Sequence, residues 1–108
     1  MAHIRLTADE RALLEVFAAR PAPTILRLAL DAIVPPLPAS RAVGPEGRDS
    51  HRRRVALGGD VVRFLHGTRL LRIAHLGNGF DRDDLWEITD TGREALAAHA
   101  AEKRNSDA

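Results

Sequence analysis

The chemistry that this sequence can offer is concentrated in its arginines. Arginine supplies fifteen of the sixteen basic residues, although the formal net charge is only +1. Residues 41–72 contain eight arginines against three acidic side chains, a formal charge of +5, whereas the residues from 73 onward have four basic against eight acidic side chains, a charge of −4. Guanidinium groups form paired hydrogen bonds with phosphates and carboxylates. This segregation favours a partner that carries such groups, although a GC-rich coding sequence would also explain the abundance of arginine.

The other polar side chains offer little for catalysis or metal binding. None of the five histidines forms a pair at the close spacing of a helical zinc site. The acidic cluster Asp81, Asp83 and Asp84 lacks the glycine and glutamate of a calcium loop, so we interpret it as a solvated hairpin tip. No glycine-rich phosphate loop or glycosidase-like carboxylate pair stands out. We therefore expect neither an enzyme nor a bound cofactor or metal.

Length and composition predict a small cytoplasmic domain. The 108 residues suit one domain spanning 1–108. The absence of cysteine excludes disulfides and thiolate metal sites. The longest apolar stretch, residues 25–34, is interrupted by charges and is too short to cross a bilayer, and the first residues do not resemble a signal peptide. We expect a cytoplasmic protein that does not contact a membrane.

Most of the arginine-rich segment falls on a predicted helix from about Ser50 to His66. Its apolar half contains Val55, Leu57, Val61, Val62, Phe64 and Leu65. Its polar half contains Arg52, Ala56, Gly59 and Arg63, flanked by Arg53 and His66. Arg52 and Arg63 lie eleven residues apart, which in a regular helix places them on one face about 16 Å apart. The small residues between them would let the helix backbone approach a flat or grooved surface.

A Gly58-Gly59 pair lies in the middle of this predicted helix. Each glycine weakens a helix by about 1 kcal/mol relative to alanine, so we expect some compensation. One alternative is that the pair kinks the helix. Another is that it divides the helix in two, with Asp60 capping the second part.

Two further helices are predicted in the first third of the chain. Thr7 and Glu10 form a capping box for a helix that begins at Ala8 and ends near Arg20. Thr24 is expected to cap a second helix that runs through Val34. Apolar residues cover nearly every side of this second helix, so we expect it to be central and mostly buried, with its two charged residues, Arg27 and Asp31, paired with each other.

Residues 35–49 form a predicted loop rich in proline and glycine. Prolines at 35, 36 and 38 prevent the preceding helix from continuing. Two alternatives remain for this segment. Either a short helix lies near Ala39 to Val43, or the segment is a flexible insertion that itself touches a partner.

The last third of the chain predicts a hairpin followed by a helix. Strands at Leu70–Leu76 and Leu85–Thr89 flank a turn at Gly77, Asn78 and Gly79. Trp86, in the second strand, is expected to pack in the core. The hydroxyl of Thr89 is expected to cap a helix from Asp90 to about Lys103. Its alanine-rich flank suits docking on the core or on a second copy, and a frayed tail is expected from about residue 104.

This hairpin-to-helix junction resembles that of bacterial winged helix-turn-helix regulators of the MarR and PadR type. In those regulators a threonine cap is followed three residues on by glycine and then by basic and apolar positions, which here are Thr89, Gly92, Arg93 and Leu96. The resemblance covers about residues 50–100. The first half of the chain departs from the pattern, because about fourteen residues separate the second and third helices where a helix-turn-helix has three or four.

The resemblance implies a mainly α fold with a small β-hairpin wing, an α+β class with the order α-α-α-β-β-α. The family's three-stranded sheet is expected to be present or reduced to the hairpin. The third helix would enter the major groove of double-stranded DNA, and the wing would reach the backbone or the minor groove. Such regulators usually read two-fold operators, so a homodimer is expected.

The same resemblance assigns candidate binding residues. The set comprises Arg48, His51, Arg52, Arg53, Arg63, Arg69, Arg72, Asn78 and Arg82. Arg54 falls toward the apolar half of the helix and is expected to pair internally. The acidic hairpin tip argues against a basic wing that inserts into DNA, because carboxylates repel phosphate.

Two functions therefore follow from the sequence. The leading hypothesis is a DNA-binding transcriptional regulator. The alternative is a winged-helix protein-interaction module, such as a small phage-type or accessory protein that modulates a larger machine. Its acidic hairpin and arginine-rich helix would suit a partner of complementary charge or head-to-tail self-association.

Overall fold

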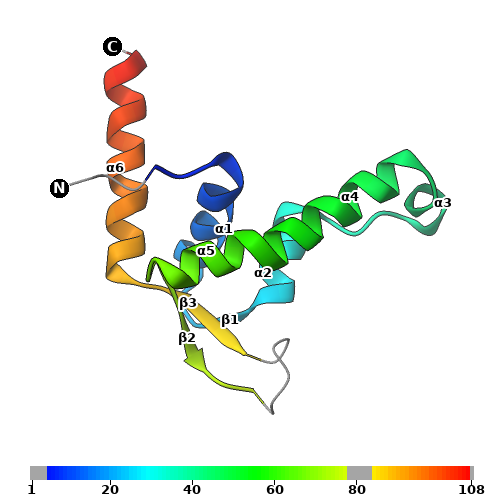
Figure 1. The fold of residues 1–108 in the computed structure, drawn as a ribbon, viewed down its shortest axis with the longest axis horizontal. Coiled ribbons are helices and arrows are strands. Elements are labelled where there is room, and N and C mark those ends of the chain that lie inside the picture. The colour runs from blue at the N-terminus through cyan, green and yellow to red at the C-terminus, as the bar shows by residue number, and fades with distance from the viewer. Residues whose placement is uncertain (1–4, 78–83, 108) are drawn as a thin grey trace.

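The computed structural model describes residues 5–77 and 84–107, and this part of the chain is mainly helical with a small three-stranded antiparallel sheet (Figure 1). The elements are α1 (Ala8–Ala18), β1 (Thr24–Ile25), α2 (Leu26–Ile33), α3 (Ala39–Ala42), α4 (Pro45–Ala56), η1 (Leu57–Val61, a π-helix), α5 (Val62–Gly67), β2 (Leu71–His75), β3 (Leu85–Ile88) and α6 (Asp90–Asp107). The α+β class predicted from the sequence is confirmed. Among the described residues, no helix is both long and apolar enough to cross a membrane.

The sheet has the order β1-β3-β2, so β3 is its central strand. Thr24 lies opposite Trp86, and Leu71 lies opposite Ile88. The two strands of the hairpin agree with the prediction, while most of the predicted turn, including Asn78, falls outside the described residues. The sheet is not reduced to the hairpin, and the predicted order lacked β1. A two-residue strand shows no alternation that a sequence pattern could detect.

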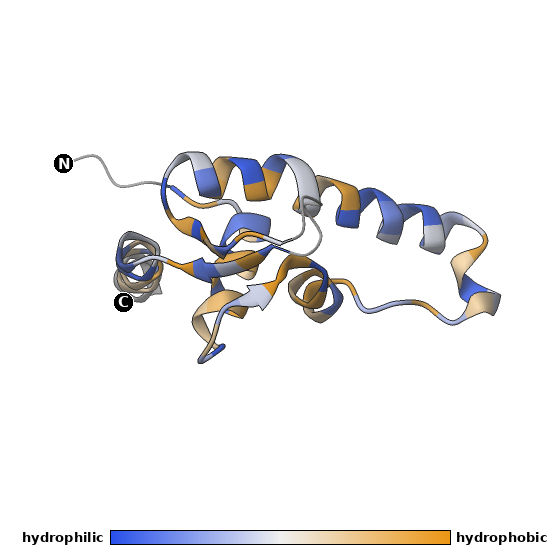
Figure 2. Ribbon diagram, turned by 90° about the horizontal axis from the view of Figure 1, so that it is seen from below, coloured by the Kyte–Doolittle hydropathy of each residue, from blue (hydrophilic) through white to orange (hydrophobic). Residues whose placement is uncertain are grey.

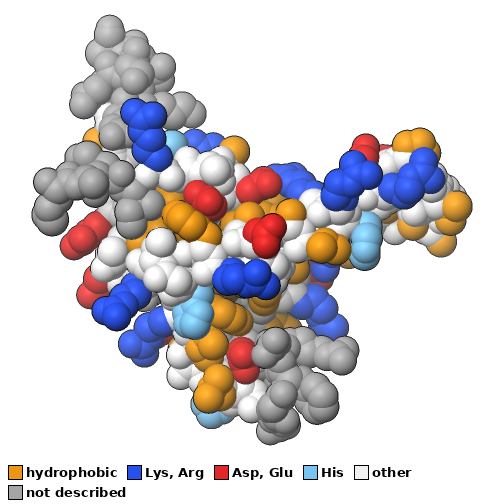
Figure 3. Space-filling view, in the orientation of Figure 1, with side chains coloured by type: hydrophobic (Ala, Val, Ile, Leu, Met, Phe, Trp, Pro, Cys, Tyr) orange, Lys and Arg blue, Asp and Glu red, His pale blue; other side chains and the backbone are white. Residues whose placement is uncertain are grey.

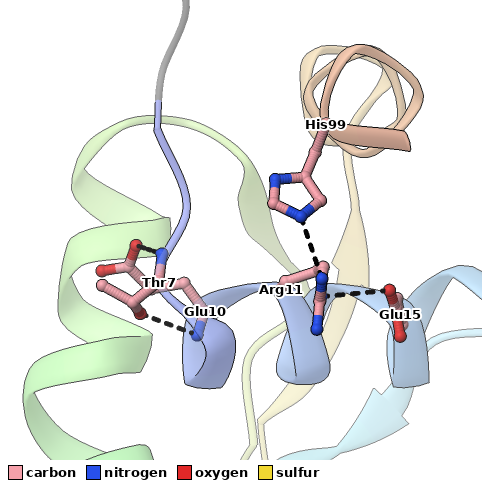
Figure 4. A network of polar contacts seen from close by, with 5 residues as sticks. All are labelled: Thr7, Glu10, Arg11, Glu15 and His99. Carbon is pink, nitrogen blue, oxygen red and sulfur yellow. Dashed lines mark hydrogen bonds and ion pairs between the residues drawn. The ribbon is translucent and has the colours of Figure 1, made fainter. Parts of the chain in front are cut away.

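α1 is the helix around which the core is built. Its capping box is present as predicted: the Thr7 amide donates to Glu10 Oε1 over 2.8 Å, and the Glu10 amide donates to Thr7 Oγ1 over 3.2 Å (Figure 4). Leu13, Leu14 and Phe17 are buried. α1 packs against α2, η1, α5, β3 and α6, so elements from most of the chain meet on it.

α2 differs from its prediction in three ways. Thr24 belongs to β1 and its hydroxyl donates to the Ala22 carbonyl, so the helix begins at Leu26 without a side-chain cap. α2 is not mostly buried, because Ala29 alone among its residues is fully buried and Leu28 is 44% exposed. Asp31 does not pair with its neighbour on the helix, since its ion-pair partner is Arg54, over 2.7 Å.

α6 packs beside α1 through an apolar and a polar contact. Ala95 and Leu96 lie against the core, so the alanine-rich flank docks at least partly on its own chain. Farther along, an Arg11 guanidinium nitrogen lies 2.9 Å from His99 Nε2 (Figure 4). Arginine can only donate, so His99 Nε2 is the acceptor. The helix extends to Asp107, beyond its predicted end.

Thr89 joins the hairpin to α6, as predicted. Its Oγ1 accepts the Gly92 amide over 3.0 Å and lies 2.6 Å from the Arg69 carbonyl oxygen, to which it donates. The Thr89 amide donates to the Leu70 carbonyl over 3.1 Å. Gly92 is packed so closely here that a Cβ would collide with the Leu70 carbonyl and lie 2.7 Å from Ile88 Cγ1. The junction therefore requires both the hydroxyl and the glycine.

Replacing Gly92 with alanine should destabilise the protein, although alanine is normally the better helix residue. We expect Gly92→Ala to lower the free energy of unfolding by about 1 to 3 kcal/mol, because the methyl group must displace backbone. Gly67→Ala is the matched control, since a Cβ at Gly67 meets nothing within 4 Å. Urea unfolding of both variants provides the measurement. Equal stability of the two variants would contradict the close approach at Gly92.

Candidate functional site

The arginine-rich helix is longer than predicted and begins earlier. α4, η1 and α5 follow one another without interruption from Pro45 to Gly67, whereas the sequence predicted a start at about Ser50. Gly44 occupies the N-cap with φ of 125°, a left-handed conformation that glycine tolerates. Pro45 follows at the first helical position, where proline is favoured. The predicted loop 35–49 therefore contains the first residues of α4.

Residues 35–56 form an arm that projects from the rest of the molecule (Figure 1). The short helix that the sequence left as one alternative is present as α3. Neither α3 nor α4 contains a buried residue, and hydrophilic residues cover much of α4 (Figure 2). α3 lies so close to the first turn of α4 that a Cβ on Gly47 would collide with the Ala42 carbonyl. The arm thus presents its side chains to the surroundings.

The Gly58-Gly59 pair lies in a π turn, η1, where the predicted alternatives were a kink or a divided helix. Asp60 does not cap the following segment. A π turn takes about one residue more than an α turn, so residues beyond it are rotated relative to a regular helix. Arg52 and Arg63 both remain exposed. The prediction that they share one face assumed a regular α-helix, and the π turn interrupts that helix between them.

The π turn and the projecting arm also correct the predicted apolar face. Leu57, Val62 and Leu65 are buried as expected, but Val55 is 59% exposed and Phe64 is 38% exposed. Val55 lies on the arm, beyond the reach of the core. Because the sequence pattern shows only the period of a regular helix, it could not reveal either effect.

Several predicted binding arginines are held by acidic partners. Arg53 contacts Asp9 over 3.0 Å, which ties the arm to α1. Arg72 contacts Glu87, its cross-strand neighbour, over 2.5 Å. Arg54 is paired internally, as predicted: it contacts Asp31 and also donates to the Val34 carbonyl over 3.0 Å. On α3, a hydrogen bond to Glu46, reinforced by the attraction between the charges, raises the pKa of Arg41.

Within the described part of the chain, four exposed predicted residues on the helix are not held by a close acidic partner. Among the described residues, Arg48 and His51 have no ion-pair partner. The Arg52 and Arg63 side chains are 80% and 82% exposed, and their nearest carboxylates are Asp49 at 3.8 Å and Asp60 at 3.9 Å. Exposed pairs at such distances contribute little and exchange readily for a stronger partner. Arg48, Arg52 and Arg63 are therefore available to an external anion. Figure 3 shows Lys and Arg side chains on the surface of the projecting arm.

The hairpin is only partly described. Arg69 is exposed at the start of the hairpin and has φ of 63°, an uncommon value outside glycine. Asn78 and Arg82, with Asp81 and Asp83, lie outside the described residues. The prediction of a solvated tip is wrong for Asp84, which is 7% exposed and accepts the Gly77 amide over 2.8 Å.

Among the hollows beside the arginine-rich helix, two bear on its function, and the sequence indicated neither. A groove of about 1010 Å³ runs along the arm between residues 35–38 and α4, lined by apolar Leu37 and Val55 and by basic Arg48 and Arg52, with no acidic residue. A second cavity, of about 270 Å³, lies beside the π turn and is lined in part by Trp86. Trp86 is buried, as predicted, and its ring meets that of His66 edge to face at 5.3 Å.

Comparisons of the chain with protein-family models, with curated proteins and with solved structures found no match. The interpretation of the site therefore rests on its own geometry and charge.

Two neighbouring arginines should differ sharply in their effect on stability. Arg54→Ala removes an ion pair and leaves the Val34 carbonyl without its donor, so we expect a loss of about 1 to 3 kcal/mol in the free energy of unfolding. Arg52→Ala should change it by less than about 0.5 kcal/mol. Thermal unfolding followed by circular dichroism compares them. An equally large loss for both variants would argue against the internal role of Arg54.

Proposed function

We propose that this protein is a DNA-binding winged-helix regulator that places the helix from Pro45 to Gly67 in the major groove. One observation carries the proposal: the exposed cations Arg48, Arg52 and Arg63, together with the exposed His51, lie along a helix whose first half stands clear of the body. A major groove about 12 Å wide admits an α-helix only if that helix protrudes. The helix meets this requirement.

The arrangement of the elements supports the winged-helix interpretation. Besides the short α3, three helical segments precede a hairpin: α1, α2 and the continuous α4-η1-α5. The hairpin leads through the Thr89 cap into a terminal helix, and β1 completes a three-stranded sheet. The departure is the arm, since α3 and a proline-rich segment stand where a helix-turn-helix has a short turn.

The charges divide the helix into anchoring and binding positions. Arg53 and Arg54 hold the arm to α1 and α2 through Asp9 and Asp31. Arg48 and Arg52 are left for phosphates or base edges. On the hairpin, Arg72 is engaged by Glu87, so we assign the wing a smaller share of the binding. Any contribution of Asn78 and Arg82 stays a prediction.

Substitution of the exposed arginines should weaken DNA binding in a way that identifies each contact. Arg52→Ala and Arg63→Ala should each cost about 1 to 3 kcal/mol if a bidentate base contact is lost. If the contact is to phosphate, the salt dependence should fall by about one unit with sequence preference unchanged. Gel shifts on the upstream region of the protein's own gene and on random duplex, at two salt concentrations, measure both effects.

Arg93→Ala is the matched control, because it removes an exposed arginine from α6, away from the proposed groove-binding helix. It should bind like the wild type. Absence of any wild-type shift at low salt would remove the DNA-binding proposal.

The groove along the arm favours a second candidate, a protein-docking function. Its apolar lining and basic rim fit a protein segment that carries apolar and acidic side chains. If the protein docks on another protein, the wild type should show no salt-dependent DNA shift. Arg52→Ala should then abolish co-purification of the partner.

A homodimer is the oligomeric state that we expect. Val43 is 86% exposed and Val55 is 59% exposed, so the arm offers apolar surface that a monomer leaves in water. Light scattering at micromolar concentration should give twice the mass of one chain, and Val55→Glu should shift it toward one chain. A monomer mass for the wild type would contradict the expectation and favour the protein-docking candidate.

A further inference from the structure

We propose that the cavity beside the π turn binds a small planar heteroaromatic molecule that carries both a hydrogen-bond acceptor and a hydrogen-bond donor. Its volume of about 270 Å³ lies between an apolar cavity of about 150 Å³ that admits benzene and the pockets of drug-sized ligands, which start near 300 Å³. A molecule of one or two rings therefore fits.

Gly58 and Gly59 line one wall of this cavity. A Cβ built on Gly59 would meet nothing within 4 Å, whereas a Cβ on Gly58 would meet Leu30 Cδ1 at 3.4 Å. Two glycines weaken a helix, and π turns occur frequently at functional sites. The open space beside Gly59 is room that a ligand can occupy.

Trp86, which lines the sheet side of the cavity, carries an unsatisfied donor. Trp86 is 7% exposed, and its Nε1 is buried with no hydrogen-bond acceptor among the described residues. Buried polar groups in folded proteins nearly always have a partner. A ligand with a ring nitrogen or a carbonyl group would supply the acceptor that the protein itself does not.

A second polar group defines the donor of the ligand. The Asp84 carboxylate lines the same cavity and is held in place by the Gly77 amide through one oxygen. Carboxylate oxygens accept several hydrogen bonds, so an amino or amide N–H of the ligand can bind here as well. The edge of a purine, or an aromatic amide, presents an acceptor and a donor together.

Entry to the buried indole N–H requires movement of a lining side chain. His66 is the candidate, because its ring contacts the Trp86 ring edge to face while the residue is itself exposed. Turning His66 outward gives up its ring contact with Trp86, whereas His66 itself does not belong to the core cluster.

The position of the cavity links it to the helix of the proposed function. Arg63 lines the same cavity and is one of the cations assigned to DNA. A ligand beside the π turn would therefore contact the helix that we propose to enter the groove. We therefore expect the bound ligand to change DNA affinity. That expectation rests on the proposed function, whereas binding of the ligand itself does not.

Intrinsic fluorescence provides a direct test, since Trp86 is the only tryptophan and the chain has no tyrosine. Adenine and benzamide, titrated separately, are the probes. We expect at least one to change Trp86 emission saturably, and His66→Ala to strengthen its binding by opening access to the indole. No saturable change with either probe would overturn the proposal.

Two variants test the location of binding. Gly59→Leu should fill the cavity and weaken binding about tenfold or more, equivalent to about 1.4 kcal/mol. Gly67→Ala, which adds a methyl group outside the cavity, should bind like the wild type. If Gly59→Leu fails to fold, Gly59→Ala and Asp84→Asn take its place, each with weakened binding expected. Unchanged affinity in folded cavity variants would overturn the assignment.

The regulatory link is tested separately by gel shift with and without the bound probe. A probe that binds but leaves DNA affinity unchanged overturns the link alone. A protein that binds the probe but not DNA overturns the proposed function and leaves the ligand site intact.

Discussion

The carbonyl group of Leu70 is the point on which the arrangement of this fold depends. The Leu70 carbonyl accepts the Thr89 amide and lies within 3.1 Å of the Thr89 hydroxyl, and Gly92 packs directly against it. The Leu70 amide donates to the Leu65 carbonyl, at the end of the arginine-rich helix. One buried residue therefore connects that helix, the hairpin and α6. The junction fixes how the end of the helix meets the hairpin and α6, and Arg69, just before Leu70, takes a left-handed conformation there.

Structure that depends on neighbours in the chain could be predicted from the sequence. The Thr7 capping box, the hairpin strands and the Thr89 cap each rely on side chains a few residues apart. The burial of Trp86 followed from its place in a predicted strand with Leu85 and Ile88. The internal pairing of Arg54 could also be inferred, because its position on the helix points inward while its charge needs a partner.

Structure that depends on distant parts of the chain could not be predicted. β1 exists because Trp86 and Leu85 lie beside two residues some sixty positions earlier. Asp31 bonds to another helix and not to its own, and the π turn changes a period that the pattern assumes to be constant. The same limit applies to the site. Exposed arginines and paired arginines look alike in the sequence, and neither hollow beside the helix has a local signature.

The absence of buried residues in α3 and α4 affects the local unfolding of the arm. Helices of this length are marginal without packing, so the arm can unwind while α1 and the sheet stay folded. Its amide hydrogens would then exchange with solvent through local opening, faster than those of α1. Trp86 lies in the body, so its emission would report the unfolding of the core and miss that of the arm. The protein thus has two levels of stability, and a partner that orders the arm must overcome the conformational entropy of that segment when it binds.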